Sequence, residues 1–314
     1  MLKLILIITL ALGVFSSVNS QPTQIYSLLS DVNGCQYEVV DMETGSDIIN
    51  NTVTGLFDST PVVFFNYVDD DNVLVLGESF EGVCLITINS KGHVVKQKQT
   101  VKWTKEIVVA QTSSYYYDPE YNTVFGIGAG YNDNNAVIVT FNFTTLLHNS
   151  INVTGEGLVM GSYDNNTKIY WYLVQSDTGT GKTLYQYNFL TKVNSGPLPL
   201  VGAPSGFATM VRYNDSLYLT SSTNGRYNLV TLYSIDDTTG GVKELVSLEN
   251  YNNELENTYW FSENYMVFLT EPNKNDDSSA ITTLNLDTLQ YSTNQLDVHL
   301  TIVNEWQKIL NWVK

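Results

Sequence analysis

The chain has 314 residues, two cysteines and a formal net charge of −17 at pH 7. This acidity argues against binding to nucleic acid or to an anionic membrane surface, because both partners require a basic footprint. Two cysteines cannot form a disulfide framework for a chain of this length, so a hydrophobic core has to hold the fold.

The N-terminus predicts export from the cytoplasm. Lys3 precedes an apolar run over residues 4–14 that is too short to span a membrane, and the small residues Val18 and Ser20 suit a signal peptidase. We therefore expect residues 1–20 to be a secretory signal peptide and Gln21 to begin the mature protein. No later segment reaches 18 consecutive apolar residues, so no membrane span is expected. The expected location is extracellular or the endolysosomal lumen.

Sequons for N-glycosylation support this predicted location. Five asparagines are followed two positions later by Ser or Thr, with no Pro between: Asn50, Asn142, Asn152, Asn165 and Asn214. Some sequons arise by chance in an Asn-rich chain, so two or three glycosylated sites are expected rather than five.

A short unit recurs six times along the chain. Each copy reads as a strand ending in Asn or Asp, a tight turn and a second strand. The closing residues are Asp41, Asn89, Asn142, Asn188, Asp236 and Asn285, spaced 46 to 53 positions apart. Asn and Asp side chains bond to their own backbone two residues on and so suit a strand-to-turn exit. A period of about 40–50 residues with this content indicates a propeller or an array of repeats.

A second series of β-branched and aromatic runs keeps the same period. The runs begin at residues 25, 73, 124, 169, 217 and 266. They are apolar at nearly every position, which predicts strands buried on both faces. With an aromatic strand before each run, every repeat contains four strands. The repeats are expected at 22–53, 61–100, 107–152, 156–200, 206–248 and 257–298.

The first repeat has no room for its innermost strand after the signal peptide. Extrapolating the period puts that strand in the C-terminal tail, near residues 309–312, so residues 300–314 complete the first repeat. The alternative is a short amphipathic helix, since Ile302, Trp306, Ile309 and Val313 fall at helical spacing. With a strand in the tail, residues 21–314 are expected to form a single all-β domain, a six-bladed propeller. Pairing of the tail with the first repeat closes the ring and leaves no exposed sheet edge where the two ends of the domain meet.

These repeats resemble the β-propeller class. The hairpin over residues 40–45 is similar to the outer hairpin of many six- and seven-bladed propellers. The Trp-Asp dipeptides, the paired kelch glycines and the sialidase box of particular propeller families are absent. The resemblance therefore implies the fold and no specific activity.

Three carboxylates follow the second strand of repeats one, two and six, which are neighbours once the ring closes. Asp31, Glu78 and Glu271 could together bind Ca²⁺ or act as acid, base and nucleophile on a glycoside. Alternatively, they are solvated loop carboxylates. The sequence establishes no cofactor, and Ca²⁺ is the one with which these residues are compatible.

Other chemistry has less support. His93, His148 and His299 fall on or beside outer strands and turns, so a Ser-His-Asp site would lack its base. Cys35 and Cys84 occupy equivalent places in neighbouring repeats. Adjacent sheets stack about 10 Å apart and a disulfide needs Cα atoms about 5.5 Å apart, so the sequence leaves a bridge between them open.

Three functions are consistent with these features. The leading hypothesis is an extracellular binding module for a protein or a carbohydrate. The second is a propeller-type hydrolase, either a glycosidase or a calcium-dependent lactonase. The third is a structural component of a matrix or coat.

Overall fold

The computed structural model describes residues 23–31, 34–56, 60–69, 72–79, 81–103, 108–110, 114–130, 135–176, 181–206, 208–222, 230–248, 259–262, 264–270, 280–295 and 308–313. The expected signal peptide lies outside them. Within these ranges, no helix has the length and hydrophobicity of a membrane span.

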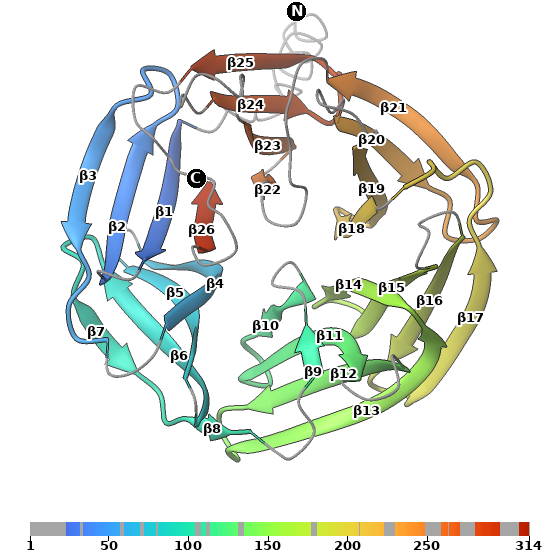
Figure 1. The fold of residues 1–314 in the computed structure, drawn as a ribbon, viewed down its shortest axis with the longest axis horizontal. Coiled ribbons are helices and arrows are strands. Elements are labelled where there is room, and N and C mark those ends of the chain that lie inside the picture. Colours follow the sequence, from blue (N-terminus) through green and yellow to red (C-terminus); the bar gives the residue numbers. More distant parts are fainter. Residues whose placement is uncertain are drawn as a thin grey trace, which may run out of the picture.

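The described strands form six antiparallel sheets placed around a central axis (Figure 1). Sheet one contains β26 (Lys308–Val313), β1 (Gln24–Asp31), β2 (Gly34–Asp41) and β3 (Asp47–Thr52). Sheet two contains β4 (Thr60–Asp69), β5 (Asn72–Glu78), β6 (Gly82–Asn89) and β7 (Val94–Gln97), with β8 (Val101–Lys102) beside β6. Sheet three contains β10 (Tyr116–Asp118), β11 (Thr123–Gly130), β12 (Asn135–Asn142) and β13 (Leu147–Glu156), with β9 (Val108–Ala110) beside β11.

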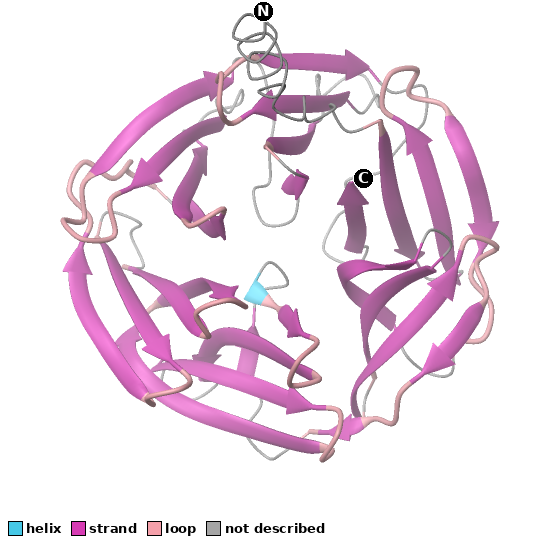
Figure 2. Cartoon of the chain, turned by 180° about the vertical axis from the view of Figure 1, so that it is seen from behind, coloured by secondary structure: helices cyan, strands magenta, loops and turns pink. Residues whose placement is uncertain are grey.

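The remaining sheets have four strands each. Sheet four contains β14 (Leu158–Asp164), β15 (Ile169–Gln175), β16 (Lys182–Asn188) and β17 (Val193–Pro199). Sheet five contains β18 (Ala208–Tyr213), β19 (Ser216–Ser222), β20 (Val230–Ile235) and β21 (Val242–Leu248). Sheet six contains β22 (Tyr259–Ser262), β23 (Tyr265–Thr270), β24 (Ala280–Asn285) and β25 (Tyr291–Gln295). Seen from behind, strands dominate the ring (Figure 2). The expected all-β propeller arrangement of small antiparallel sheets is confirmed.

The C-terminal tail is a strand, and the helical alternative is wrong. β26 pairs antiparallel with β1, with Leu29 opposite Ile309 and Ile25 opposite Val313. It also lies beside β4 and β22, the inner strands of the two flanking sheets. Strands from the two ends of the chain therefore share sheet one.

The six recurring Asn and Asp residues form the turns that the sequence predicts. Asp236 Oδ1 accepts hydrogen bonds from the backbone N–H groups of Thr238 and Thr239 at 2.9 and 3.0 Å. The same pair of bonds, from residues two and three or four positions on, forms at Asp41, Asn89, Asn142, Asn188 and Asn285. The repeat in the sequence is thus a repeat of turn chemistry.

The second strands are buried on both faces, as expected. On β5, Val73 and Val75 join a core cluster with Tyr37 of sheet one, whereas Leu74 and Leu76 join a cluster with Val139 of sheet three. Alternate side chains of one strand thus fill the cores on either side of their sheet. Each fully buried aliphatic side chain contributes about 1.5–3 kcal/mol to stability.

Backbone hydrogen bonds also join neighbouring sheets at the outer rim. Val201, which follows β17, donates to Gly240 O at 2.8 Å and accepts from the N–H of Val242 at 2.9 Å. Gly240 has φ +75°, and a Cβ there would lie 2.4 Å from Pro199 O. Only glycine fits at this position. A residue with a side chain disfavours the left-handed backbone conformation, and its Cβ would collide with the backbone of the preceding sheet.

Candidate binding site

The carboxylates predicted to bind calcium are placed only in part. Asp31 is the last residue of β1, opposite Gly34, and Glu78 is the last residue of β5, opposite Thr60 and Val83. Both therefore lie at the same end of the second strands of adjacent sheets. Glu271 lies outside the described residues. In the described part of the chain, no three His, Cys, Asp or Glu residues are grouped so that they could hold a metal ion.

A pocket of about 360 Å³ lies on the opposite face of the ring, where first and third strands turn into their neighbours. We call it the inter-sheet pocket, because sheets five and six both line it. Its apolar residues are Leu217, Ile235, Leu245, Leu286 and Leu289, and its carboxylates are Asp215, Asp236, Asp237 and Asp287. Tyr218, Ser216 and Ser234 complete the lining.

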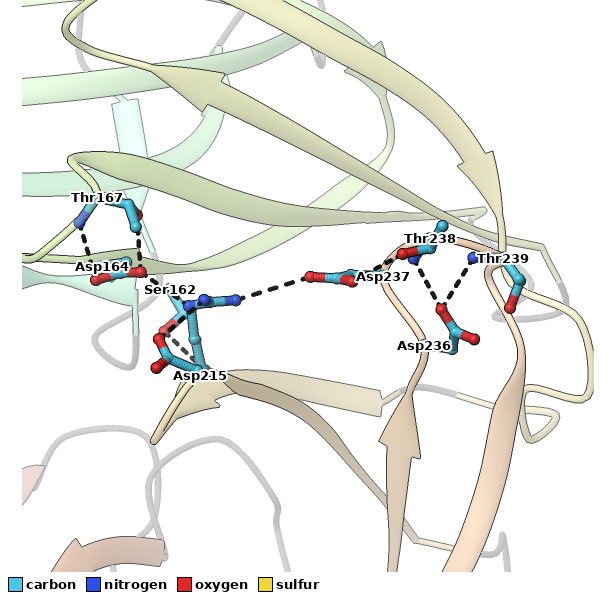
Figure 3. Close-up of polar contacts among 9 residues, drawn as sticks. Ser162, Asp164, Thr167, Asp215, Asp236, Asp237, Thr238 and Thr239 are labelled. Carbon is cyan, nitrogen blue, oxygen red and sulfur yellow. Dashed lines mark hydrogen bonds and ion pairs between the residues drawn. The ribbon is translucent and has the colours of Figure 1, made fainter.

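Arg212 on β18 fixes the edge of this pocket nearest to sheet four. Its Nε donates to Asp164 Oδ2 at 3.0 Å and its Nη2 to Asp215 Oδ1 at 3.3 Å. Its Nη1 lies 4.0 Å from Asp237 Oδ2, which is too long for a hydrogen bond. Figure 3 shows Asp164 and Asp215 on one side of this network and Asp237 on the other.

Two further contacts hold Arg212 in place. Its guanidinium group lies over the ring of Trp171, with 5.4 Å between Cζ and the ring centroid. Its backbone N–H donates to Ser162 Oγ at 2.9 Å. Only 12% of the Arg212 side chain and 7% of the Asp164 side chain are exposed. A buried pair of this kind is costly to break by removing one partner, typically by about 3–5 kcal/mol.

Asp164 and Asp236 favour their ionised forms. Burial raises the pKa of Asp164, but hydrogen bonds from Thr167 and Asn166 and the charge of Arg212 outweigh it and hold that pKa below its usual range. Hydrogen bonds from Thr239 and from the backbone of Thr238 lower the pKa of Asp236. Asp236 therefore contributes a negative charge to the pocket at neutral pH.

An equivalent ion pair joins sheets three and four. Lys168 Nζ contacts Asp118 Oδ2 at 2.7 Å and Glu120 Oε2 at 2.8 Å, and Tyr163 donates its hydroxyl to Asp118 Oδ2 at 3.0 Å. Burial lowers the pKa of Lys168, but the two carboxylates outweigh it and raise that pKa overall. The interaction between Arg212 and Asp164 is thus a structural device of the repeat, and each pair has an exposed carboxylate beside it, Glu120 beside Lys168 and Asp215 beside Arg212.

Chemically, this arrangement can hold an extended cation with an aliphatic part. Asp215 and Asp237 expose 84% and 42% of their side chains, and the lining also contains four leucines and Ile235. This pocket was not predicted from the sequence, because Asp236 and the other recurring Asn and Asp residues were interpreted only as strand-to-turn exits. The available signal was a further carboxylate in each turn that lines the pocket, at Asp215, Asp237 and Asp287.

His148 has a packing role. It lies on β13, stacked on Phe141 with ring centroids 4.8 Å apart and edge-on to Trp103 at 6.2 Å. His93 lies in the turn between β6 and β7, where its N–H donates to Asn89 Oδ1 at 2.9 Å. His299 lies outside the described residues.

Four of the five sequons present exposed asparagines, namely Asn50, Asn152, Asn165 and Asn214. Asn142 is half-buried, and its Nδ2 donates to Thr123 Oγ1 at 3.0 Å while its Oδ1 accepts the turn hydrogen bonds. Asn50 Nδ2 likewise donates to Glu38 Oε1 at 3.3 Å and to Asp47 Oδ2 at 3.1 Å. A glycan on either Nδ2 would compete with these bonds. Glycosylation of two or three of the five sites stays a prediction.

The cysteine bridge that the sequence left open is not present. Cys35 on β2 and Cys84 on β6 are buried thiols in the core cluster between sheets one and two. Cys84 Sγ donates to Gly77 O at 3.8 Å and accepts from Gln97 Nε2 at 3.5 Å. Both partners belong to its own sheet, on β5 and β7.

Comparison with known proteins identifies the fold. No protein-family model matches the chain, and no curated protein matches its sequence. Among solved structures, TolB from Acinetobacter baumannii superposes with a TM-score of 0.60 at 14% identity, over 97% of this chain and 69% of that one. A chain of the nidogen/laminin complex gives 0.55 at 9% identity, over 91% and 98%. A putative TolB from Agrobacterium tumefaciens gives 0.53 at 12% identity, over 94% and 99%. These likenesses establish the propeller fold, and at such identities they establish nothing further.

Proposed function

We propose that this chain is a secreted, glycosylated propeller of six blades, closed by its C-terminal strand, which acts as an extracellular binding module for a protein or a carbohydrate. The inter-sheet pocket carries this proposal, because it is a formed concave site on a ring stiffened by buried cores and ion pairs. Binding residues positioned on a rigid scaffold lose little conformational entropy when a ligand arrives.

One structural neighbour is consistent with a protein partner. A chain of the nidogen/laminin complex shares the fold along nearly its whole length. That complex consists of two different proteins, so the propeller fold does occur in a protein–protein assembly. The low identity transfers neither partner to this chain.

The test is a binding screen beside an activity screen. The chain is expressed through a eukaryotic secretory pathway, and the medium is examined for protein whose mass falls on enzymatic removal of N-glycans. The purified protein is then applied to arrays of glycans and of extracellular ectodomains, and assayed on glycoside and lactone substrates with calcium. We expect saturable binding to at least one array member with Kd below about 10 μM, about −7 kcal/mol. Substrate turnover without binding would instead support the hydrolase. Absence of both binding and turnover would favour the structural component of a matrix or coat.

A further inference from the structure

We propose that the inter-sheet pocket binds a lysine or arginine side chain presented by a protein partner. This inference rests on the proposed binding-module function and specifies the chemistry of the partner. It follows from the size of the pocket, from the leucines and the isoleucine in its lining and from its carboxylates.

The size suits one long side chain. At about 360 Å³ the pocket lies near the lower end of the range of about 300–1,000 Å³ that small-molecule sites occupy. The apolar residues of the lining, among them Leu245, Leu286 and Leu289, match the methylene stem of lysine or arginine. Such side chains bury their stems on apolar surface and keep the charged end near polar groups.

The charge of the rim selects a cation. Four carboxylates line the pocket, and the guanidinium of Arg212 contacts Asp215 and, at 4.0 Å, Asp237, while it is also paired with Asp164 outside the pocket. The formal charge of these five carboxylates and Arg212 together is therefore −4. Asp215 is bonded to Arg212, which Asp164 and Trp171 hold in place, so part of the rim is ordered before any ligand arrives. Preorganisation of this kind reduces the entropic cost of binding.

The spacing of the carboxylates argues for a side chain rather than a metal ion. They do not form a group that could hold a metal, among the residues that the structure describes. Ca²⁺ requires six to eight oxygen ligands at about 2.3–2.6 Å. An ammonium or guanidinium group instead spreads its hydrogen-bond donors over several acceptors and needs no such closed shell.

The test uses two seven-residue probe peptides and single-charge variants. One peptide carries two lysines on a glycine and serine background with a central leucine, and the other carries acetyl-lysine in their place. Acetylation keeps the stem and removes the charge. Binding is measured by fluorescence polarisation in 50 mM and 300 mM NaCl. The protein variants are Asp237→Asn and Asp287→Asn, and their melting temperatures are compared with that of the wild type.

Glu43→Gln is the matched control. Glu43 is exposed and lies two positions after Asp41, as Asp287 lies two positions after Asn285, so the two changes remove one charge at equivalent turns. We expect the lysine peptide to bind wild type at least fivefold more tightly than the acetylated peptide does. Each pocket variant should weaken binding of the lysine peptide at least threefold, whereas Glu43→Gln should weaken it by less than a factor of two. Binding of this peptide to the wild type should also be weaker in 300 mM than in 50 mM NaCl.

Equal binding of the two peptides would overturn the proposal, as would an equal loss in Glu43→Gln and in the pocket variants. The array ligand found for the wild type separates this failure from a failure of the proposed function. If the pocket variants bind that ligand and the lysine peptide as the wild type does, the pocket assignment is wrong and the binding-module function stands. If the wild type binds neither any array member nor the peptide, both proposals are wrong.

Discussion

Glu38 should make the stability of this protein depend on pH in a direction opposite to that of most carboxylates. It lies on β2 with 7% of its surface exposed, and its Oε1 accepts a hydrogen bond of 3.3 Å from Asn50 Nδ2. Burial, with a further contribution from the charge of Asp47, raises its pKa from 4.5 to about 7. The folded protein therefore holds this proton more tightly than the unfolded chain does.

The sign of the effect follows from proton linkage. Between pH 4.5 and 7 the folded state binds more protons at Glu38 than the unfolded state, so the free energy of unfolding falls as the pH rises through this window. Above pH 7 the full cost of burying the carboxylate is present. At about 1.4 kcal/mol per pH unit, the rise to about 7 corresponds to an upper limit of about 3 kcal/mol.

Glu38→Gln removes this titration and nearly preserves the shape of the side chain. We expect the variant to gain stability relative to wild type as the pH rises, by about 1–3 kcal/mol between pH 4.5 and 8. The measurement is urea unfolding followed by intrinsic fluorescence at four pH values. Glu43→Gln, an exposed change two residues after the same strand, controls for net charge. A difference between variant and wild type that is the same at every pH would refute the reasoning.

Three further changes test other parts of the structure. Gly240→Ala should lower the free energy of unfolding in urea by at least about 1 kcal/mol, because Gly240 has φ +75° and a Cβ there would lie against Pro199 O. Leu289→Gly, at φ +58° in the equivalent turn, should raise the free energy of unfolding by up to about 1 kcal/mol. Arg212→Met should cost about 3–5 kcal/mol in the same assay, since it leaves Asp164 buried without its charge partner. Addition of 5 mM calcium should raise the melting temperature of the wild type and not that of Glu78→Gln if the proposed calcium site exists, and an unchanged wild-type melt would show that its carboxylates are solvated.

Much of the fold could be predicted from the sequence because the signals were local. Asn and Asp residues mark the exits of the third strands, and the runs beginning at residues 73 and 124 lie in second strands. The pairing of β26 with β1 also followed, since a repeat that lacks one strand at its start has to obtain it elsewhere. These inferences needed only the period and the two-residue alternation of strands.

The candidate site was not predictable in the same way. The carboxylates of the inter-sheet pocket belong to turns, and a turn residue that bonds to its own backbone looks the same whether or not it also lines a cavity. Asp236 illustrates this, because its Oδ1 accepts the turn hydrogen bonds although the residue lines the pocket. Burial of Cys35 and Cys84 followed from their place in strands, but the direction of each sulfur depends on packing between sheets.

The contacts between sheets nevertheless obey a rule that the sequence contains. Arg212 and Asp164 are 48 residues apart, Lys168 and Asp118 are 50 apart, and Ser114 Oγ accepts from the N–H of Gly161, 47 positions on. Each separation equals about one repeat, because equivalent positions of adjacent sheets face each other around the ring. Opposite charges one period apart are therefore candidates for ion pairs between sheets, and a carboxylate whose partner one period away is missing is a candidate for an external ligand. Asp287 meets that condition, because the residues 47 to 50 positions before it are Asp237, Thr238, Thr239 and Gly240, none of which is a cation.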